Sequence, residues 1–259
     1  MSICKTLSAL GVIAIVSLSL AAIGSSQAQA FDLKPLSADT TGFKNVINEY
    51  QQFVQGESQP FDNPAARELD PTQLKLKFDH DVRVFFLNEG ASKRNTLNFS
   101  ATGSTLSSGA IFQDIACITG CNISEPDGNL NIGDWVSLGN FTSGTLFDFT
   151  LQAMNGMDNR VDTYGAKPEF NPDGLSHLVA YEYKNRVVLG FEDLFGNQGA
   201  TGSRNEGSDR DFNDVVFVVD LPIENSAATP EPTTMAGIAL ASCGMATLKR
   251  HQKRRGAIA

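Results

Sequence analysis

Carboxylate and amide side chains gather in two short segments that a Gly- and Ser-rich loop separates. These candidate metal ligands are Glu192, Asp193, Asp209, Asp211, Asn213 and Asp214. The alternation in the second segment predicts that its oxygens lie on one side of an extended chain, and a hairpin of the flanking strands would bring the first segment to them. Carboxylates so close together repel one another unless a cation or hydrogen bonds compensate them. Ca²⁺ takes several hard oxygen ligands in flexible geometry, so the pattern predicts a calcium site.

A structural interpretation of the same residues stays open. Asp and Asn beside strands commonly form Asx-turns, and Arg210 or Arg186 would then neutralise part of the charge without a metal. An EF-hand is excluded, because Asp214 stands where that loop needs glycine and no helix flanks the segment. A second oxygen-rich segment at residues 125–134 is interpreted as turn chemistry, with a second ion site as the alternative.

Several phrases of the sequence resemble a bacterial domain family of unknown function that is common in exported proteins. The phrases are Gly190 to Leu194, Asp209 to Phe217, Val84 to Ala91 with Asn95, and Asn171 to His177. The resemblance covers most of residues 72–221 and implies a β-sandwich with a suspected Ca²⁺ role, but no established activity. The long insertion between Leu194 and Asp209 departs from the family pattern.

The hydrophobic pattern predicts an all-β fold, an antiparallel β-sandwich or jelly-roll-like domain with a short N-terminal helix. Apolar residues at spacings of three and four between Thr41 and Gly56 indicate the helix. Alternating residues predict a hairpin of strands 74–78 and 82–86. Six further strands are expected at 97–101, 135–138, 146–153, 178–183, 186–191 and 215–221.

The two ends of the chain have the composition of targeting signals. Residues 1–30 contain Lys5, an apolar run and a small-residue ending, which predicts a secretory signal peptide cut by signal peptidase. Near the other end, Pro230, Glu231 and Pro232 precede a short apolar stretch and a basic cluster. This order resembles the PEP-CTERM sorting signal, which implies processing by an exosortase-type membrane protease.

The apolar stretch of the tail is too short for a permanent anchor. As a helix its roughly 16 residues would span about 24 Å, against a hydrocarbon core of about 30 Å. We therefore expect only transient membrane association, and export to the cell surface or extracellular matrix of a Gram-negative-type bacterium. The expected division is a signal peptide (1–30), an N-terminal helix and loop (31–71), a β-sandwich domain of unknown function (72–221), a linker (222–229) and a sorting tail (230–259).

Cys117 and Cys121 are the two cysteines between the targeting segments. In an oxidising compartment they are predicted to close a small disulfide loop worth about 2 kcal/mol. Zinc is the alternative, but neither His80 nor His177 has a companion at metal-ligand spacing.

Charge argues against nucleic acid as a partner. The chain has a formal net charge of −9, and residues 31–229 hold 28 of its 29 acidic residues but 14 of its 20 basic ones. So acidic a surface repels phosphate backbones and attracts metal cations.

Three classes of function stay open. The expected one is a secreted structural or adhesive protein that Ca²⁺ stabilises, and not an enzyme. The second is a Ca²⁺-dependent carbohydrate-binding module for a surface polysaccharide, whose sugar-stacking residues would be drawn from Trp135, Tyr164, Tyr181 and Tyr183. The third is a hydrolase with paired carboxylates such as Glu182 and Glu192. No catalytic residue and no organic cofactor site is singled out, since the sequence between the targeting segments has no Gly-x-Ser-x-Gly elbow.

Overall fold

The computed structural model describes six ranges of the chain, residues 31–54, 66–90, 93–104, 106–115, 130–155 and 158–224. The predicted signal peptide, the Cys117 and Cys121 pair and the sorting motif at 230–232 lie outside these ranges. Within them, no helix has the length and apolar character that crossing a membrane requires.

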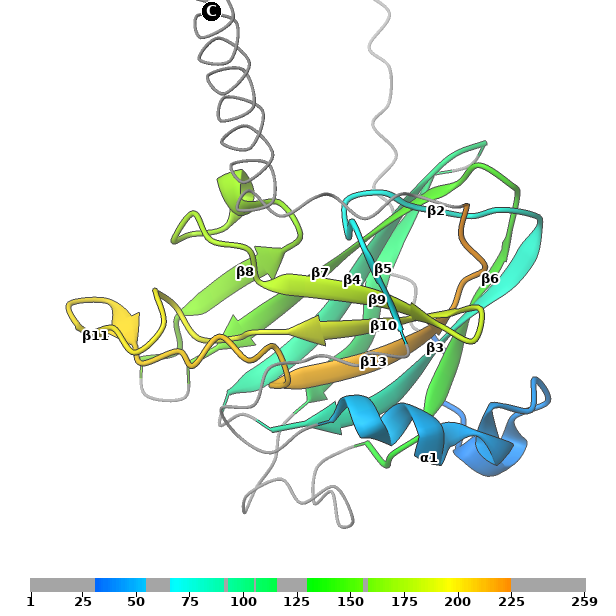
Figure 1. The fold of residues 1–259 in the computed structure, drawn as a ribbon, viewed down its shortest axis with the longest axis horizontal. Coiled ribbons are helices and arrows are strands. Elements are labelled where there is room, and N and C mark those ends of the chain that lie inside the picture. Colours follow the sequence, from blue (N-terminus) through cyan, green and yellow to red (C-terminus); the bar gives the residue numbers. More distant parts are fainter. Residues whose placement is uncertain are drawn as a thin grey trace, which may run out of the picture.

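Two antiparallel sheets pack face to face, which confirms the predicted all-β sandwich (Figure 1). The six-stranded sheet has the order β1 (Arg67–Leu69), β9 (Leu178–Tyr183), β10 (Arg186–Phe191), β13 (Val215–Asp220), β3 (His80–Glu89) and β6 (Trp135–Phe141). The five-stranded sheet has the order β2 (Leu74–Lys75), β7 (Leu146–Met154), β4 (Arg94–Thr102) and β5 (Leu106–Ile115), and β8 (Val161–Gly165) also pairs with β7. A small hairpin of β11 (Thr201–Gly202) and β12 (Asn205–Glu206) projects from one end of the sandwich.

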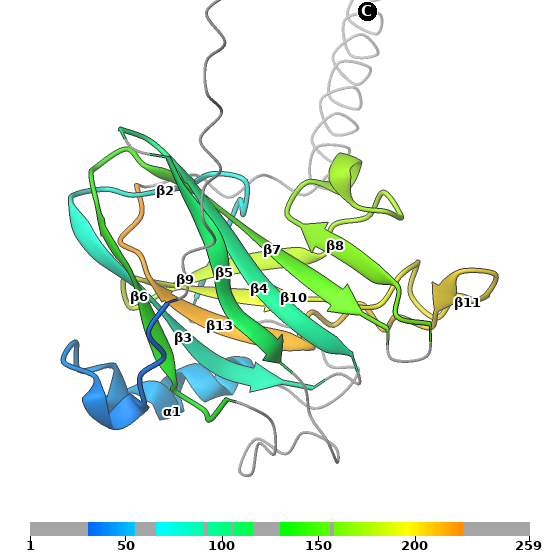
Figure 2. The same ribbon diagram turned by 180° about the vertical axis from the view of Figure 1, so that it is seen from behind.

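The main core fills the space between the two sheets. Strand β4 shows why the sequence folds this way, because its buried and exposed residues alternate strictly along its length. Its inward residues Leu97 and Phe99 meet Phe217 and other apolar residues of the opposite sheet in one cluster. The residues of β4 between them are polar and exposed or partly exposed, and Figure 2 shows β4 and its neighbours β5 and β7 at the front of the sandwich. This alternation is typical of a sheet with one face packed and the other solvated.

A second core lies on the far side of the six-stranded sheet. The N-terminal segment forms η1 (Leu36–Ala38), η2 (Phe43–Asn45), α1 (Ile47–Tyr50) and η3 (Gln51–Phe53). Phe43, Tyr50 and Phe53 are fully buried against this sheet. The predicted helical stripe is therefore present, but it is a chain of short turns that ends at Phe53, not one helix running to Gly56.

The predicted hairpin of residues 74–78 and 82–86 is wrong, because β2 and β3 belong to different sheets. After β2 the chain crosses the edge of the sandwich, where Leu76 N donates to Thr145 O at 2.8 Å and Lys77 N donates to Pro222 O at 2.9 Å. Phe78 lies half-exposed in this crossing. Alternation identifies a strand but not its partner, so both arrangements fit the sequence pattern. The six other predicted strands are confirmed as β4, β6, β7, β9, β10 and β13.

The second core yields a stability prediction. We expect Phe53→Ala to lower the free energy of unfolding by about 3–5 kcal/mol, because it leaves a large cavity beneath the sheet. Phe78→Ala is the matched control and should change stability by less than about 0.5 kcal/mol, because Phe78 lies on the surface. Urea unfolding followed by fluorescence measures both. Equal midpoints for the two variants would mean that the N-terminal segment does not stabilise the sandwich.

Candidate metal centre

The hairpin of β10 and β13 positions the acidic segments. Phe191, the last residue of β10, pairs with Val215, the first residue of β13. Glu192 therefore leaves the sheet beside the point where Asp214 enters it. The pairing of the flanking strands that the sequence predicts is present, and the insertion between Leu194 and Asp209 extends from this end of the hairpin.

The second acidic segment is folded, whereas the sequence predicts an extended chain. Arg210 and Phe212 have φ angles of 59° and 61°, in the left-handed region that non-glycine residues seldom adopt. Asp211, between them, is held by its neighbour Asn213. The Asn213 backbone N donates to Asp211 Oδ1 at 3.1 Å, and Asn213 Nδ2 donates to Asp211 Oδ2 at 2.7 Å. The Asx-type bonding of the structural interpretation is therefore real, and it fixes the Asp211 carboxylate.

Three carboxylates meet at this end of the sandwich. Glu192, Asp209 and Asp211 each offer one oxygen, and these oxygens lie within 4.8 Å of one another. Glu192 has 0% of its surface exposed, yet neither of its carboxylate oxygens has a hydrogen-bond partner among the described residues. The nearby Ser208 hydroxyl is also buried without a hydrogen bond there. A buried carboxylate without partners is costly, so the arrangement calls for a proton or a cation.

Burial shifts the proton affinity of these groups upward. It raises the pKa of Glu192 to about 7, with nearby Asp193 and Asp209 adding to the shift, although Ser208 and Arg210 oppose it. Burial also raises the pKa of Asp193 to about 6. The pKa of Asp214 rises well above its usual range through burial and then through the charges of Asp193 and Glu192. At neutral pH a cation would therefore compete with protons for these carboxylates.

Asp193 and Asp214 lie beside the three-carboxylate group without contributing an oxygen to it. Asp193 Oδ2 accepts a hydrogen bond from Asn95 Nδ2 at 2.8 Å, which joins the end of β10 to β4. Asp214 Oδ2 accepts from the Asp193 backbone N at 2.7 Å. Of the six predicted ligands, the structure brings together three, and the other three hold the surrounding backbone and side chains in place.

Neither candidate arginine bonds to Glu192. Arg186 lies at the opposite end of β10, 3.6 Å from an oxygen of Asp220. Arg210 donates to the backbone oxygen of Ser176 and stacks on Phe212 with 4.9 Å from its Cζ to the ring centroid. The charge of Arg210 acts on Glu192 without a hydrogen bond, so it neutralises part of the negative charge, as the structural interpretation allows, but leaves both carboxylate oxygens of Glu192 unbonded among the described residues.

A buried histidine supports the backbone of Glu192. His177 Nδ1 lies 2.8 Å from the Glu192 backbone oxygen, and Nε2 lies 2.9 Å from Asp173 Oδ2. The imidazole also stacks on Tyr164 at a centroid distance of 3.9 Å. His177 is fully buried, which the sequence pattern does not indicate. The Asn171 to His177 phrase of the family resemblance is the one signal that marks this turn.

An ionic network fastens the β11 and β12 hairpin over the site, and sequence reasoning missed it. Lys93 is 5% exposed and donates to the Asp193 backbone oxygen at 2.8 Å and to Glu206 Oε2 at 2.5 Å. Arg160 Nη2 donates to Glu206 Oε1 at 2.6 Å, and Arg204 pairs with Asp162. These pairs join residues far apart in sequence, so spacing along the chain does not reveal them.

Comparison with known proteins finds a match to one family model over part of the chain and indicates no activity. The sequence model of DUF4114, a domain of unknown function, matches residues 141–222. The match begins at the last residue of β6 and continues through β13, so it includes the three carboxylates and the whole β10 and β13 hairpin. It supports the expected resemblance over a shorter stretch than residues 72–221. No curated protein and no solved structure matches the chain.

The raised pKa of Glu192 predicts a pH dependence of stability without divalent cations. Between its ordinary pKa of 4.5 and about 7, folded Glu192 holds a proton that the unfolded chain has released. Stability should therefore fall as the pH rises through this window. Urea midpoints in chelator at pH 5 and pH 7 measure the slope.

Glu192→Gln is the control for this prediction. It keeps the shape of the side chain but cannot titrate, so the fall between pH 5 and pH 7 should become smaller. General repulsion among the acidic residues is common to both proteins and cancels in the comparison. Identical slopes would show that Glu192 titrates normally.

Proposed function

We propose that this protein is an exported structural or adhesive protein of the bacterial cell surface or matrix, in which one Ca²⁺ ion fastens the end of the β-sandwich. The observation that carries the metal part is Glu192, whose two buried oxygens lack hydrogen bonds and face the carboxylates of Asp209 and Asp211. A bound cation would compensate this charge and tie the end of β10 to the folded segment before β13.

The chemistry of the ligand set favours calcium over other metals. The three converging groups are carboxylates, and hard oxygen ligands suit Ca²⁺. Zinc binds nitrogen and sulfur more readily, but both nitrogens of the nearby His177 face oxygen atoms of the protein. Mg²⁺ demands octahedral geometry and sheds water reluctantly, so it should bind this set less well.

Export rests on the two targeting segments of the sequence. The signal peptide would lead the chain outward, and the tail beginning at Pro230, Glu231 and Pro232 would be processed by an exosortase-type protease. An acidic, two-sheet domain with a Ca²⁺ clamp fits an extracellular structural role, because calcium is abundant outside cells and the ion would rigidify a long loop. No nucleic acid partner is proposed, since the charge of the chain opposes it.

The aromatic residues suggested for a carbohydrate-binding module are not placed to stack on sugars. Trp135 is 4% exposed and Tyr164 is fully buried, while Tyr181 and Tyr183 pack against Phe53 of the N-terminal segment. Trp135 and Tyr164 are therefore core residues, and Tyr181 and Tyr183 are partly buried, so none of the four presents a fully exposed ring to a sugar.

The paired carboxylates suggested for a hydrolase do not meet. Glu182 pairs with Val187 across the β9 and β10 hairpin and bonds to Arg67 at 2.9 Å, whereas Glu192 follows the other end of β10. Glycosidase carboxylates must lie on the two sides of one scissile bond. This pair is therefore wrong as an acid and base.

Calcium should raise the melting temperature of the purified protein. At a free concentration of one hundred times the dissociation constant, it should add about 2.7 kcal/mol to the free energy of unfolding. Glu192→Gln should abolish the response, because it keeps the shape of the side chain but removes the negative charge that the cation compensates. Calorimetric scans with Ca²⁺, with Mg²⁺ and with chelator measure the effect.

Glu49→Ala is the control carboxylate, because Glu49 pairs with Lys184 at the surface, away from the candidate site. It should leave the calcium response intact. The calcium proposal would be contradicted if chelator did not change the melting temperature and calorimetry showed no heat of binding at millimolar Ca²⁺. The three carboxylates would then have a purely structural role.

The targeting part of the proposal has its own test. We expect the exported protein to begin near Phe31 and to have lost its tail near Pro230, because the two segments are processing signals. Intact-mass analysis of protein from the cell surface or medium measures both ends. A product that still ends at Ala259 would contradict processing of the tail, whatever the outcome of the calcium test.

A further inference from the structure

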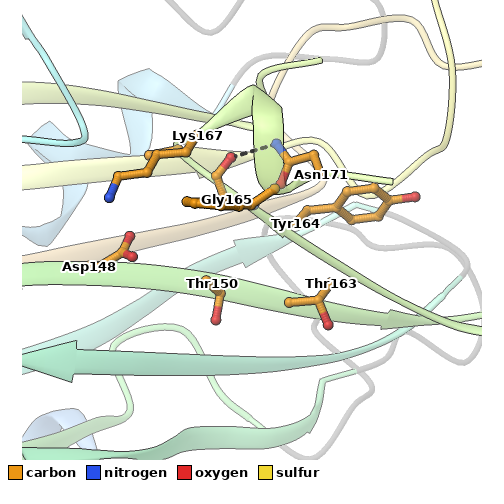
Figure 3. A pocket seen from close by; sticks show the side chains of 9 residues that line it. Asp148, Thr150, Thr163, Tyr164, Gly165, Lys167 and Asn171 are labelled. Atoms are coloured by element: carbon orange, nitrogen blue, oxygen red, sulfur yellow. Dashed lines mark hydrogen bonds between the residues drawn. The ribbon is translucent and has the colours of Figure 1, made fainter. Parts of the chain in front are cut away.

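A half-open hollow lies on the outer side of the five-stranded sheet, beside the turn that follows β8 (Figure 3). Its volume is about 70 Å³. The residues that matter for its chemistry are Asp148, Thr150, Thr163, Gly165, Lys167 and Phe170. We propose that this hollow binds a neutral sugar residue of a surface polysaccharide. The inference rests on the adhesive role proposed above, for which it names a ligand class, but it uses no residue of the metal centre.

The hollow follows from how the edge of β7 is paired. On one edge β7 pairs with β4 along its whole length. On the other edge, β8 begins its pairing at Thr150 opposite Gly165, and β2 pairs with residues 146 and 147. Asp148 lies between these two partners, where no strand covers the edge. The gap therefore exposes a carboxylate on the polar face of the sheet.

The turn after β8 forms a fixed wall of the hollow. Asn171 Oδ1 accepts from Gly165 N at 2.8 Å, and Asn171 Nδ2 donates to Gly165 O at 2.9 Å (Figure 3). Asn171 Nδ2 also donates to the Leu175 backbone oxygen at 2.6 Å. These bonds hold the chain where it leaves β8, so the hollow is preorganised and little ordering is needed on binding.

The polar groups of the hollow are available to a ligand. Asp148 is half-buried. Its carboxylate accepts a hydrogen bond from the Phe149 backbone, but no hydrogen bond or ion pair joins it to another side chain in the described part of the chain. Burial raises the pKa of Asp148, although Lys167 opposes the shift. Figure 3 shows Asp148 and Lys167 at one end of the hollow, with Thr150 and Thr163 farther along the two strands. Together they offer a carboxylate acceptor, an ammonium donor and two hydroxyls.

An exposed aromatic ring borders this polar set. Phe170 belongs to η4 (Pro168–Phe170) and is 76% exposed, although phenyl rings usually lie in the core. Lys167 Nζ lies 5.8 Å from its ring centroid. A ligand that matches both features needs an apolar face for the ring and hydroxyl groups for the hollow. A pyranose has a C–H face and a hydroxyl edge, so it meets both requirements.

The size of the hollow limits how such a sugar would bind. A water molecule occupies roughly 30 Å³ of liquid volume, so the hollow has room for a few polar atoms and not for a whole sugar ring. The hydroxyl edge would enter between Asp148 and Lys167, while the C–H face would rest on Phe170. In this position the sugar residues on either side of the bound one could extend over the protein surface, as binding to a polysaccharide requires.

Charge favours a neutral sugar over an acidic one. The one ammonium group of the hollow is offset by Asp148, and the chain as a whole carries a net charge of −9. An anionic polysaccharide would be repelled by this surface, whereas neutral hydroxyls can donate to the carboxylate.

Titration calorimetry tests the proposal with cellohexaose, maltohexaose and mannohexaose as neutral probes and with hexagalacturonate as the acidic probe. We expect at least one neutral probe to bind, and Asp148→Asn and Phe170→Ala each to weaken it by about tenfold or more. Phe78→Ala removes an exposed ring elsewhere on the surface and should leave the affinity unchanged. Thermal unfolding of the three variants checks that each remains folded.

Three results would overturn the proposal. They are the absence of heat with every neutral probe at millimolar concentration, binding that both hollow variants leave unchanged, and tighter binding of hexagalacturonate. Every titration is run with Ca²⁺ and with chelator. If sugar binding disappeared both in chelator and in Glu192→Gln, the sugar would bind at the metal centre. This result would also contradict the proposal that the hollow binds it. Sugar binding that persists in chelator while calcium fails to move the melting curve would overturn the metal proposal alone.

Discussion

Strands β10, β13 and β3 are buried on both faces, because the five-stranded sheet covers one side and the N-terminal helical segment covers the other. In β13 all six residues are buried. Because neither face of β13 is exposed to solvent, water has little access to the residues at the ends of this strand. The carboxylates at the end of the β10 and β13 hairpin are therefore placed in a poorly hydrated environment by the packing of the whole sandwich. This constraint explains why burial raises the pKa values of Glu192, Asp193 and Asp214.

The surroundings of the site resist relaxation of this unfavourable burial. The backbone of Glu192 is held by His177, and that of Asp193 by Asp214 and Lys93. The insertion that follows returns to the sheet through Glu206, which bonds to Lys93 and Arg160. Because these contacts come from residues just before β4, β8, β9 and β13 and from β12, the carboxylate group cannot open without disturbing several elements. A cation in its midst would relieve the charge without any rearrangement.

The two candidate binding sites are connected through one turn but differ in character. The turn after β8 carries Asn171, which shapes the hollow, and Asp173, which bonds to His177 below the carboxylate group. One site is buried and highly charged, as suits an ion that stabilises the fold. The other is open, mixed in charge and bordered by an exposed ring, as suits a ligand that is exchanged.

The sequence by itself determined the fold class, the place of eight strands and the identity of the acidic residues, because alternation and local composition are properties of neighbouring residues. The sequence did not determine which strands pair with one another. The alternation in residues 74–86 fits a hairpin as well as two strands of different sheets, and only packing separates them. Strand β5 was missed because its Ser and Gly residues weaken the pattern on an exposed face.

The same division holds at the site. Spacing nominated six ligands, but the left-handed backbone at Arg210 and Phe212 and the burial of Glu192 decided which three meet. The sequence likewise did not show which aromatic side chains are exposed: Trp135 is buried and Phe170 is exposed. Burial, charge compensation and exposure depend on residues far away in the chain, so they arise only when the tertiary structure brings those residues together.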